Sequence, residues 1–462
     1  MQYKQCLKEV EQILQIEKSF DIVKRKLLVQ NTELSFLFVD GMIKDDVMER
    51  IMEHLLLKGK ISKDIQMFAD ENLAYVEVSV EHDIGNMVTG VLSGACLLVV
   101  EGCEDAVLLD VRTYPVRSMQ EPEDERVLRG SRDGFVETLI FNTALIRRRI
   151  RDSHLRMEYH SVGETSKTDV VLCYMENKAD KNILKNMQMQ LDTLKVQALT
   201  MTQESIVEAL VPHTWWNPFP KVRYTERPDT AASNILEGKI LLLVDTSPSA
   251  MILPTSFFDF VQEPQDYYLP PVTGNYLRFL RILVFFASLC ITPLWFHFIT
   301  NPQLTPSFLN FILLKETPHV PILLQLLLME IGIDILKTAS LNTPNALNNS
   351  FSLIGALVLG DFAVQAGWLN AQVILYMAFA AMANFTQASY ELGYALKFLR
   401  IMLLLFIALI PKIGILIGIV FVLLVMANCK TITKTSYFYP LFPFHPKALK
   451  KLFVREKIRS QK

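Results

Sequence analysis

Several motifs by which enzymes are commonly recognised are missing from this chain of 462 residues. It has no G-x-x-x-x-G-K-[ST] phosphate loop, no G-x-S-x-G nucleophile turn, no H-E-x-x-H zinc motif and no G-x-G-x-x-G after a strand. These absences remove the sequence evidence for nucleotide hydrolysis, acyl transfer, zinc-dependent proteolysis and dinucleotide binding. We therefore predict a protein that is not an enzyme and that has no catalytic residues and no cofactor.

The cysteines and histidines lack the spacing of metal ligands. The cysteines lie far apart and include no C-x-x-C pair, which predicts reduced, buried, apolar side chains rather than redox or metal-binding groups. They are Cys6, Cys96, Cys103, Cys173, Cys290 and Cys429. His154 and His160 are six residues apart and would fall on different faces of a helix, a spacing that does not favour their binding one metal ion. We predict no bound metal.

Charged residues are scarce in one long block of the chain. Residues 279–428 hold only 6 basic and 5 acidic residues in 150 positions, too few for a surface in water. Residues 1–278 carry a net charge of −11, from 31 basic and 42 acidic residues, and residues 429–462 a net charge of +8, from 9 basic and 1 acidic. The block is typical of a membrane domain, and the tail is typical of a segment held against anionic lipid.

Apolar segments within this block predict membrane helices. They cover 279–300, 320–337, 351–366, 369–389 and 398–427. The first is long enough to cross roughly 30 Å of hydrocarbon as a helix. Arg278 and Arg281 mark its N-terminal end, which the positive-inside rule places in the cytoplasm together with the whole N-terminal region.

The basic tail limits the number of crossings. If all five segments crossed the membrane, the tail would lie on the side opposite the cytoplasm, whereas its positive charge favours the cytoplasmic side. One segment is therefore expected not to cross, with 320–337 the best candidate and 351–366 the next. We predict a membrane domain of four to five helices over 271–428 and a basic cytoplasmic tail over 429–462.

Two carboxylates distinguish the segment 320–337. Glu330 and Asp334 are four residues apart on one helical face, which Lys337 continues, and like charges at that spacing repel. An ionisable group deep in a bilayer costs at least a few kcal/mol and is often functional. One interpretation is a ring of carboxylates, one set per subunit, lining a cation pathway, with Asp361 a further candidate. The alternative is an amphipathic helix at the membrane surface, or inter-helix salt bridges to Lys337, Lys397, Arg400 or Lys412.

Small residues recur at helical spacing in two membrane segments. Such spacing lets helices approach closely in lipid, either between subunits or within one. The candidate packing residues are Ala356, Gly360, Ala363, Gly367, Gly414 and Gly418. Pro411 and Lys412 interrupt the segment 398–427, which predicts a kinked helix there.

The first 278 residues alternate between two apolar patterns. Helical spacing predicts helices over 6–30, 43–58, 134–152, 181–194 and 204–211. Runs rich in β-branched residues predict strands over 73–80, 94–100, 106–111, 169–175 and 239–245. The expected fold is a cytoplasmic mixed α/β region of two small subdomains, 1–130 and 131–270, followed by an α-helical integral membrane domain.

An arginine-rich stretch covers residues 126–152. Gly134, preceded by Ser131 and Asp133, is the predicted start of an amphipathic helix that ends in arginines. Consecutive side chains project about 100° apart around a helix, so the arginines form no flat patch, and the surrounding region is acidic. Both points disfavour nucleic-acid binding.

We predict instead that these arginines pair with carboxylates across a subdomain or subunit boundary. The stretch "RYTERPD" (223–229) predicts a corner fixed by internal ion pairs and is a second candidate for that boundary. The candidate interface residues are Arg147, Arg148, Arg149, Arg151, Glu226, Arg227 and Asp229.

Three separated stretches resemble a known family. They are "RGSRDGFVETLIFNTALIRRRIRD" (129–152), "NPFPKVRYTERPD" (217–229) and the region from 236 to 245 into the membrane half. In this order they resemble the GerA family, the A-type subunits of bacterial spore germination receptors, and the similarity covers nearly the whole chain. Asp361 and Gln365 depart from the commoner pattern of that family, which leaves the chemistry of a pore open.

The resemblance implies a cytoplasmic N-terminal region of two subdomains and a membrane domain in the spore inner membrane. It further implies assembly of A-type subunits into a ring, thought to be pentameric, around an ion-conducting pore that serves germination. Two functions stay open: an oligomeric cation channel or channel subunit, and a non-conducting scaffold or accessory subunit for germination receptors or dipicolinic acid transport. The expected partners are membrane lipid, further copies of this chain and other germination membrane proteins, with no nucleic acid.

Overall fold

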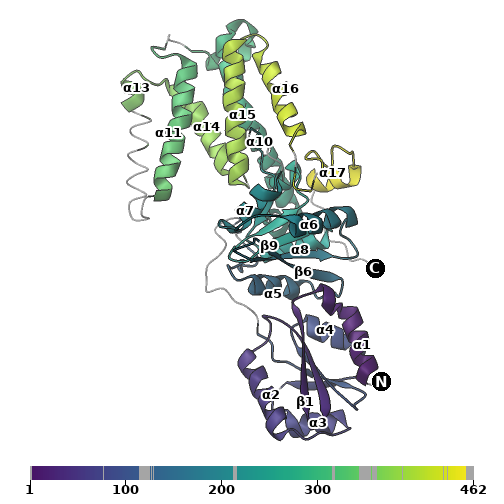
Figure 1. Ribbon diagram of the computed structural model, residues 1–462. Helices are drawn as coiled ribbons and strands as arrows, with labels where there is room; N and C mark the ends of the chain where they lie inside the picture. Colours follow the sequence, from purple (N-terminus) through teal and green to yellow (C-terminus); the bar gives the residue numbers. More distant parts are fainter. Residues whose placement is uncertain are drawn as a thin grey trace. The chain divides into compact units, whose positions relative to one another are not determined.

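The structure is a computed structural model in which the chain forms two compact units (Figure 1). The α/β unit comprises Met1–Pro212, Val222–Thr255 and Thr431–Thr435, and the helical unit comprises the remaining residues. The residues described are 3–75, 77–113, 125, 127, 129–211, 216–314, 318–342, 355, 360, 362–387, 389–429, 431–433 and 435–453.

The first half of the α/β unit is an antiparallel sheet with helices on both faces. Its strands are β1 (Ile22–Val29), β2 (Thr32–Val39), β3 (Val78–Glu81), β4 (Cys96–Val100) and β5 (Ala106–Leu109), in the order β1-β2-β4-β5-β3. The helices are α1 (Tyr3–Leu14), α2 (Asp45–Lys58), α3 (Ile65–Asn72) and α4 (Ile84–Leu92). Because strand side chains alternate between faces, Leu34 and Phe36 pack with α2 and α3, whereas Leu37 and Val39 pack with α1 and α4.

The second half repeats this arrangement. Its strands are β6 (Leu155–Val162), β7 (Thr168–Met175), β8 (Arg223–Thr225), β9 (Ile240–Val244) and β10 (Ala250–Leu253), in the order β6-β7-β9-β10-β8. The helices α5 (Leu139–Arg149) and α8 (Pro228–Leu236) cover one face, and α6 (Lys181–Thr193) and α7 (Thr202–Leu210) cover the other. Both halves thus run helix, two strands, two helices, strand, helix, two strands, so the expected α/β region with two sheets is confirmed.

The predicted helix over 6–30 is wrong in its second part. Residues 22–29 form β1, which pairs with β2 in a hairpin. Gln30 and Asn31 connect the strands with φ angles of 49° and 64°, and a two-residue turn of this kind matches the right-handed twist of the paired strands.

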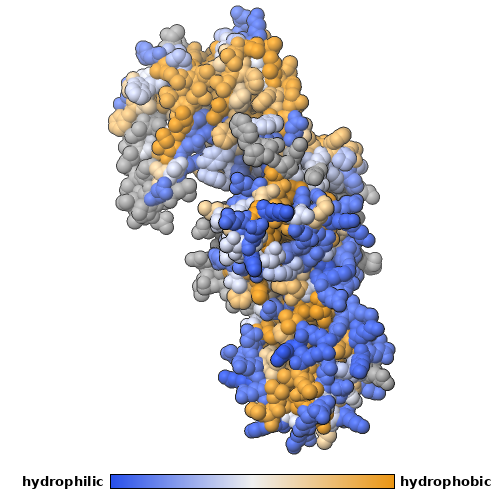
Figure 2. All heavy atoms as spheres, viewed as in Figure 1, coloured by the Kyte–Doolittle hydropathy of each residue, from blue (hydrophilic) through white to orange (hydrophobic). Residues whose placement is uncertain are grey.

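Among its described residues, the helical unit contains two helices that are long and apolar enough to cross a membrane, α10 (Pro271–Thr300) and α15 (Tyr390–Leu409). Its other helices are α9 (Gln265–Tyr268), α11 (Ile322–Asn342), α13 (Ala363–Gln365), α14 (Ala371–Phe385), α16 (Gly414–Ala427) and α17 (Pro446–Phe453). Short 3-10 turns cover Phe257–Val261, Pro302–Leu304 and Ser307–Ile312. Apolar side chains gather over α14, α15 and α16 in Figure 2.

The predicted single kinked helix over 398–427 is wrong. Its residues belong to two helices, α15 and α16, which are separated by a turn at Pro411 and Lys412 and pack against each other. α15 ends at Leu409, just before Pro411, whose ring and missing amide hydrogen disfavour continuation of the helix.

Candidate functional site

Four charged side chains meet between α11 and α15. The Lys397 ammonium contacts an Asp334 carboxylate oxygen, and it donates to the Glu330 carbonyl oxygen at 3.0 Å. Arg400 Nε donates to Glu330 Oε1 at 2.6 Å, and its Nη1 donates to the Ser288 carbonyl oxygen of α10 at 2.8 Å. The cluster therefore connects three helices, and its formal charges sum to zero.

The two carboxylates differ in their surroundings. The Glu330 side chain is 3% exposed and contacts both cations, whereas the Asp334 side chain is 34% exposed. Asp334 Oδ1 is nevertheless buried and makes no hydrogen bond with any described residue. A buried carboxylate oxygen without a donor is costly, so this atom marks a place where a water molecule or a cation would be stabilised.

Lys337, one turn beyond Asp334, faces aromatic rings. Its Nζ lies 4.8 Å from the ring centre of Phe385, 5.6 Å from that of Tyr394 and 6.0 Å from that of Tyr390. Cation–π attraction at these distances holds the ammonium of Lys337 away from Asp334. The contacts of Glu330 and Asp334 are thus with Lys397 and Arg400, as the salt-bridge alternative expects.

The small-residue stripe in 351–367 is only partly described. Ala356 and Asp361 lie outside the described residues, and a Cβ added to Gly360 would meet no atom of a described residue within 4 Å. Ala363 lies in α13, but Gly367 follows the end of that helix with φ +72°, so it terminates the helix instead of lying on its face.

Gly414 and Gly418 lie where α16 approaches α15 within the same chain. A Cβ on Gly414 would lie 2.2 Å from the Phe406 carbonyl oxygen, and one on Gly418 would lie 2.5 Å from Leu403 Cδ2. Both glycines therefore serve close packing of this helical hairpin.

Four arginines in and just after α5 are candidate interface residues. One of them, Arg147, pairs with Asp21 across the two halves of the α/β unit. Its guanidinium donates to both carboxylate oxygens of Asp21, from Nε at 3.0 Å and from Nη2 at 3.2 Å. The side chains are 0% and 1% exposed. Arg148 and Arg151 are exposed.

Arg149 pairs within the second half of the α/β unit. Its Nη2 donates to Asp133 Oδ2 at 2.6 Å and to Ser131 Oγ at 3.0 Å. Burial raises the pKa of the Asp133 carboxyl, but the hydrogen bonds from Arg149 and Ser131 outweigh it and the net pKa is lowered. Ser131 and Asp133 therefore do not cap the helix: the predicted start at Gly134 is wrong, and α5 begins at Leu139.

The corner between β8 and α8 is held by Arg227, which is 1% exposed. Its guanidinium contacts both carboxylate oxygens of Asp229, at 3.1 and 2.7 Å, and donates to the Ser131 carbonyl oxygen at 2.8 Å. The Glu226 carbonyl oxygen accepts from the Phe135 amide at 2.8 Å. This corner thus ties α8 to the segment before α5.

One charged cluster was missed by sequence reasoning. Arg281, taken as a marker of the membrane boundary, donates to Glu263 at 2.7 Å and to Asp266 at 3.1 and 3.2 Å. Arg278 is 0% exposed and contacts the same buried Asp266 at 3.3 Å. The signal was present as two acids ahead of two arginines, but pairing over 12 to 18 residues requires the turn that α9 makes.

No group of three or more histidine, cysteine or acidic side chains that could hold a metal occurs among the described residues. His160 pairs instead with carboxylates, 3.5 Å from Glu158 and 3.0 Å from Asp192. His154 lies 2.8 Å from Asp152.

Comparisons with known proteins agree with the resemblance. Residues 8–462 match the family model described as Bacillus/Clostridium GerA spore germination protein. Stage V sporulation protein AF of Bacillus subtilis (strain 168) is 39% identical over 95% of this chain and 89% of that protein. Segments 245–260 and 315–337 resemble that protein within the family, and the match confirms the resemblance.

Two further matches extend the comparison. Spore germination protein KA of Bacillus subtilis (strain 168) is 26% identical over 96% of this chain and 82% of that protein. The crystal structure of the N-terminal domain of the A subunit of the Bacillus megaterium spore germinant receptor GerK3 is 22% identical, with a TM-score of 0.42, over 54% of this chain and 94% of that one.

Proposed function

The chain belongs to the Bacillus/Clostridium GerA family of spore germination proteins, and from this premise we propose that it is an oligomeric cation channel, or a subunit of one, in the spore inner membrane. Its role would be ion release during germination. Membership of the family supports the germination role, and the helical unit supports the channel.

The proposal includes a membrane location in which the start and the end of the helical region lie on the same side of the bilayer. α10 and α15 are long and apolar enough to cross, and many apolar side chains of the helical unit are exposed, such as Phe279 at 64% and Leu409 at 78%. After α16 the chain returns to the α/β unit, where Ile432 is 1% exposed in the core of the second sheet. Because one compact unit cannot lie on both sides of a bilayer, the start and the end of the helical region face the same compartment.

The observation that carries the channel proposal is the incomplete pairing of Asp334. Glu330 is neutralised by Arg400 and Lys397, so it is poorly placed to attract a further cation. Asp334 shares Lys397, and its buried Oδ1 has no donor among the residues that the structure describes. The candidate ring of carboxylates therefore narrows to Asp334, repeated once per subunit, with Asp361 still a candidate from the sequence.

A non-conducting scaffold or accessory subunit is the second candidate. It is favoured by the zero net charge of the α11–α15 cluster, since balanced ion pairs can serve to fix helices and nothing else. In that case the protein would organise germination receptors or the dipicolinic acid transport machinery.

Planar-bilayer recording with the purified full chain separates the two candidates. A channel gives discrete cation-conducting events, and cross-linking or native mass spectrometry in the same preparation gives a closed ring of subunits. A protein that inserts, as judged by resistance to alkaline extraction, yet gives no conductance would favour the scaffold.

A further inference from the structure

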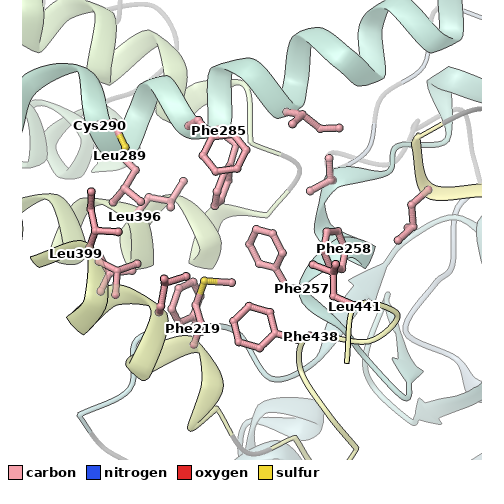
Figure 3. Close-up of a pocket in the computed structure, with 18 of the residues that line it drawn as sticks. Phe219, Phe257, Phe258, Phe285, Leu289, Cys290, Leu396, Leu399, Phe438 and Leu441 are labelled. Atoms are coloured by element: carbon pink, nitrogen blue, oxygen red, sulfur yellow. The ribbon is translucent and has the colours of Figure 1, made fainter. Parts of the chain in front are cut away.

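The helical unit contains an apolar cavity of about 390 Å³ (Figure 3). Side chains of α10, α15 and α16 form one side of it, and the opposite side is formed by the turn 257–261, the segment 438–441 and α17. Phe257, Phe285, Leu396 and Phe438 are among the lining residues, and Figure 3 shows their side chains around a common space. The lining consists of hydrocarbon groups together with the Cys290 thiol and the Met426 thioether, so the cavity offers water too few hydrogen-bond partners to be stable there.

The short helix α17 closes one end of the cavity with its apolar side. Leu452 and Phe453 line the cavity, and the Leu452 carbonyl oxygen accepts a hydrogen bond from Arg278 Nη1 at 3.0 Å. Arg278 is itself buried and contacts Asp266. The position of α17 against α10 is thus fixed by a polar anchor as well as by apolar contact.

The C-terminal segment has the composition of an element that lies in a membrane interface. Phe442 and Phe444, just before α17, are 74% and 67% exposed. Three lysines follow in α17: Lys450 and Lys451 lie three and four residues after Lys447, a spacing that by sequence places them on one side of a helix. Exposed aromatic rings beside a cationic helical face are typical of binding to anionic lipid.

We propose that the cavity binds an acyl chain of an anionic phospholipid whose headgroup is attracted by the positive charge of the C-terminal segment. The proposal rests on the proposed membrane location. A polar metabolite would leave its hydrogen-bonding groups without partners, whereas an acyl chain is narrow and needs none. By sequence, the three lysines of α17 give the C-terminal segment a positive charge, which favours an anionic lipid over a zwitterionic one.

The test is lipid retention by the purified full chain. The protein is incubated with mixed micelles of phosphatidylglycerol and phosphatidylcholine, separated from free lipid, and analysed by native mass spectrometry. Leu423→Trp fills the cavity from α16, and Leu424→Trp is the matched control, because both leucines are about half exposed, at 52% and 55%, and only Leu423 lines the cavity. A third variant changes the three lysines of α17 to glutamine.

We expect the wild type to retain one lipid per chain, with phosphatidylglycerol preferred. Leu423→Trp should lower the retention of both lipids about tenfold. Leu424→Trp should leave the retention of both lipids as it is in the wild type. The lysine variant should keep a bound lipid but lose at least roughly a fivefold preference for phosphatidylglycerol. Equal retention by both tryptophan variants, or an unchanged preference without the lysines, would overturn the proposal.

Flotation with phosphatidylglycerol-containing vesicles separates this inference from the proposed function. If the wild type does not float with the vesicles, the membrane location itself fails. If it floats and retains no lipid, or if a second copy of the chain occupies the cavity, only the acyl-chain site fails.

Discussion

Removing the Asp21 carboxylate should loosen the two halves of the α/β unit from each other. Asp21 accepts both hydrogen bonds of the Arg147 guanidinium, and Arg147 Nη1 also donates to the Leu155 carbonyl oxygen at 3.3 Å. Beside this pair the Phe20 amide donates to the Met157 carbonyl oxygen at 3.1 Å, a backbone contact between the two halves. Asp21→Leu would leave the arginine buried with a single carbonyl partner.

The expected magnitude follows from the burial of the pair. Removing one partner of a buried ion pair costs about 3–5 kcal/mol, because the remaining charge stays desolvated. Replacing both, as Asp21→Leu with Arg147→Met, removes both desolvation costs and should be close to neutral or stabilising. Arg148→Met is the matched control, since it removes the next arginine of the same helix, which is exposed, and should change stability by at most about 0.5 kcal/mol.

Amide hydrogen exchange of the full chain is the suitable assay, because it reports the opening of this region separately from the helical unit. A cost of 3–5 kcal/mol corresponds to roughly two to three and a half orders of magnitude in exchange rate. We expect this acceleration at the Phe20 amide and in residues 155–157 for Asp21→Leu, and little of it for the double variant. If the single variant exchanges as the wild type does, or if the double variant is as labile as the single one, the reasoning about the buried pair is refuted.

Two further predictions concern packing and pH. Gly414→Ala should destabilise the full chain by about 1–3 kcal/mol and so lower its melting temperature, because the added methyl group overpacks against the Phe406 carbonyl oxygen. Gly360→Ala, whose added Cβ meets no described residue within 4 Å, should leave the melting temperature unchanged; equal melting temperatures of the two variants would argue against a tight α15–α16 hairpin. Burial lowers the pKa of His160, but the carboxylates of Glu158 and Asp192 outweigh burial, and the net pKa is raised from 6.5. The protonated imidazole therefore contributes its full stabilisation below that pH, and the stabilisation is lost as pH rises through the folded pKa. His160→Gln should therefore remove part of the pH dependence of exchange in β6 at pH values above 6.5, and an unchanged profile would contradict the assignment.

The arrangement of α5 shows where sequence reasoning reached its limit. Periodicity identified the buried stripe that includes Leu139, Asn142 and Ile146. The start of the helix depends on a contact over 106 residues, because the Leu139 amide donates to Asp245. Asn142 also binds the Val136 amide and carbonyl oxygen, which holds the preceding residues out of the helix. Neither contact leaves a local signal.

The hairpin of β1 and β2 was missed for a similar reason. Residues 22–29 contain apolar positions that fit a helix as well as a strand, and the choice is made by pairing with β2. The turn at Gln30 and Asn31 was the available signal, although glutamine is uncommon at a positive φ.

Composition alone predicted where the helices of the helical unit lie in the sequence, but not how they pack. A shortage of charge located the apolar helices, and four-residue spacing placed Glu330 and Asp334 on one face. Which cations meet them depends on how α11, α14 and α15 pack. Lys337 is close in sequence but faces aromatic rings, whereas Lys397, more than sixty residues away, makes the contact.

The most direct test of the channel proposal is the reversal potential of the purified chain in a planar bilayer under a potassium chloride gradient, compared between the wild type and Asp334→Asn. Glu391→Gln serves as the control, because it removes an exposed carboxylate of the same unit outside the α11–α15 cluster. The account predicts that the wild type and Glu391→Gln select cations. Asp334→Asn leaves Lys397 and Arg400 with Glu330 as their shared carboxylate, so the cluster gains a net positive charge and the reversal potential shifts toward zero or toward anion selectivity. A conducting wild type whose selectivity is unchanged in Asp334→Asn would contradict the role of Asp334, and an inserted wild type that never conducts would contradict the channel itself.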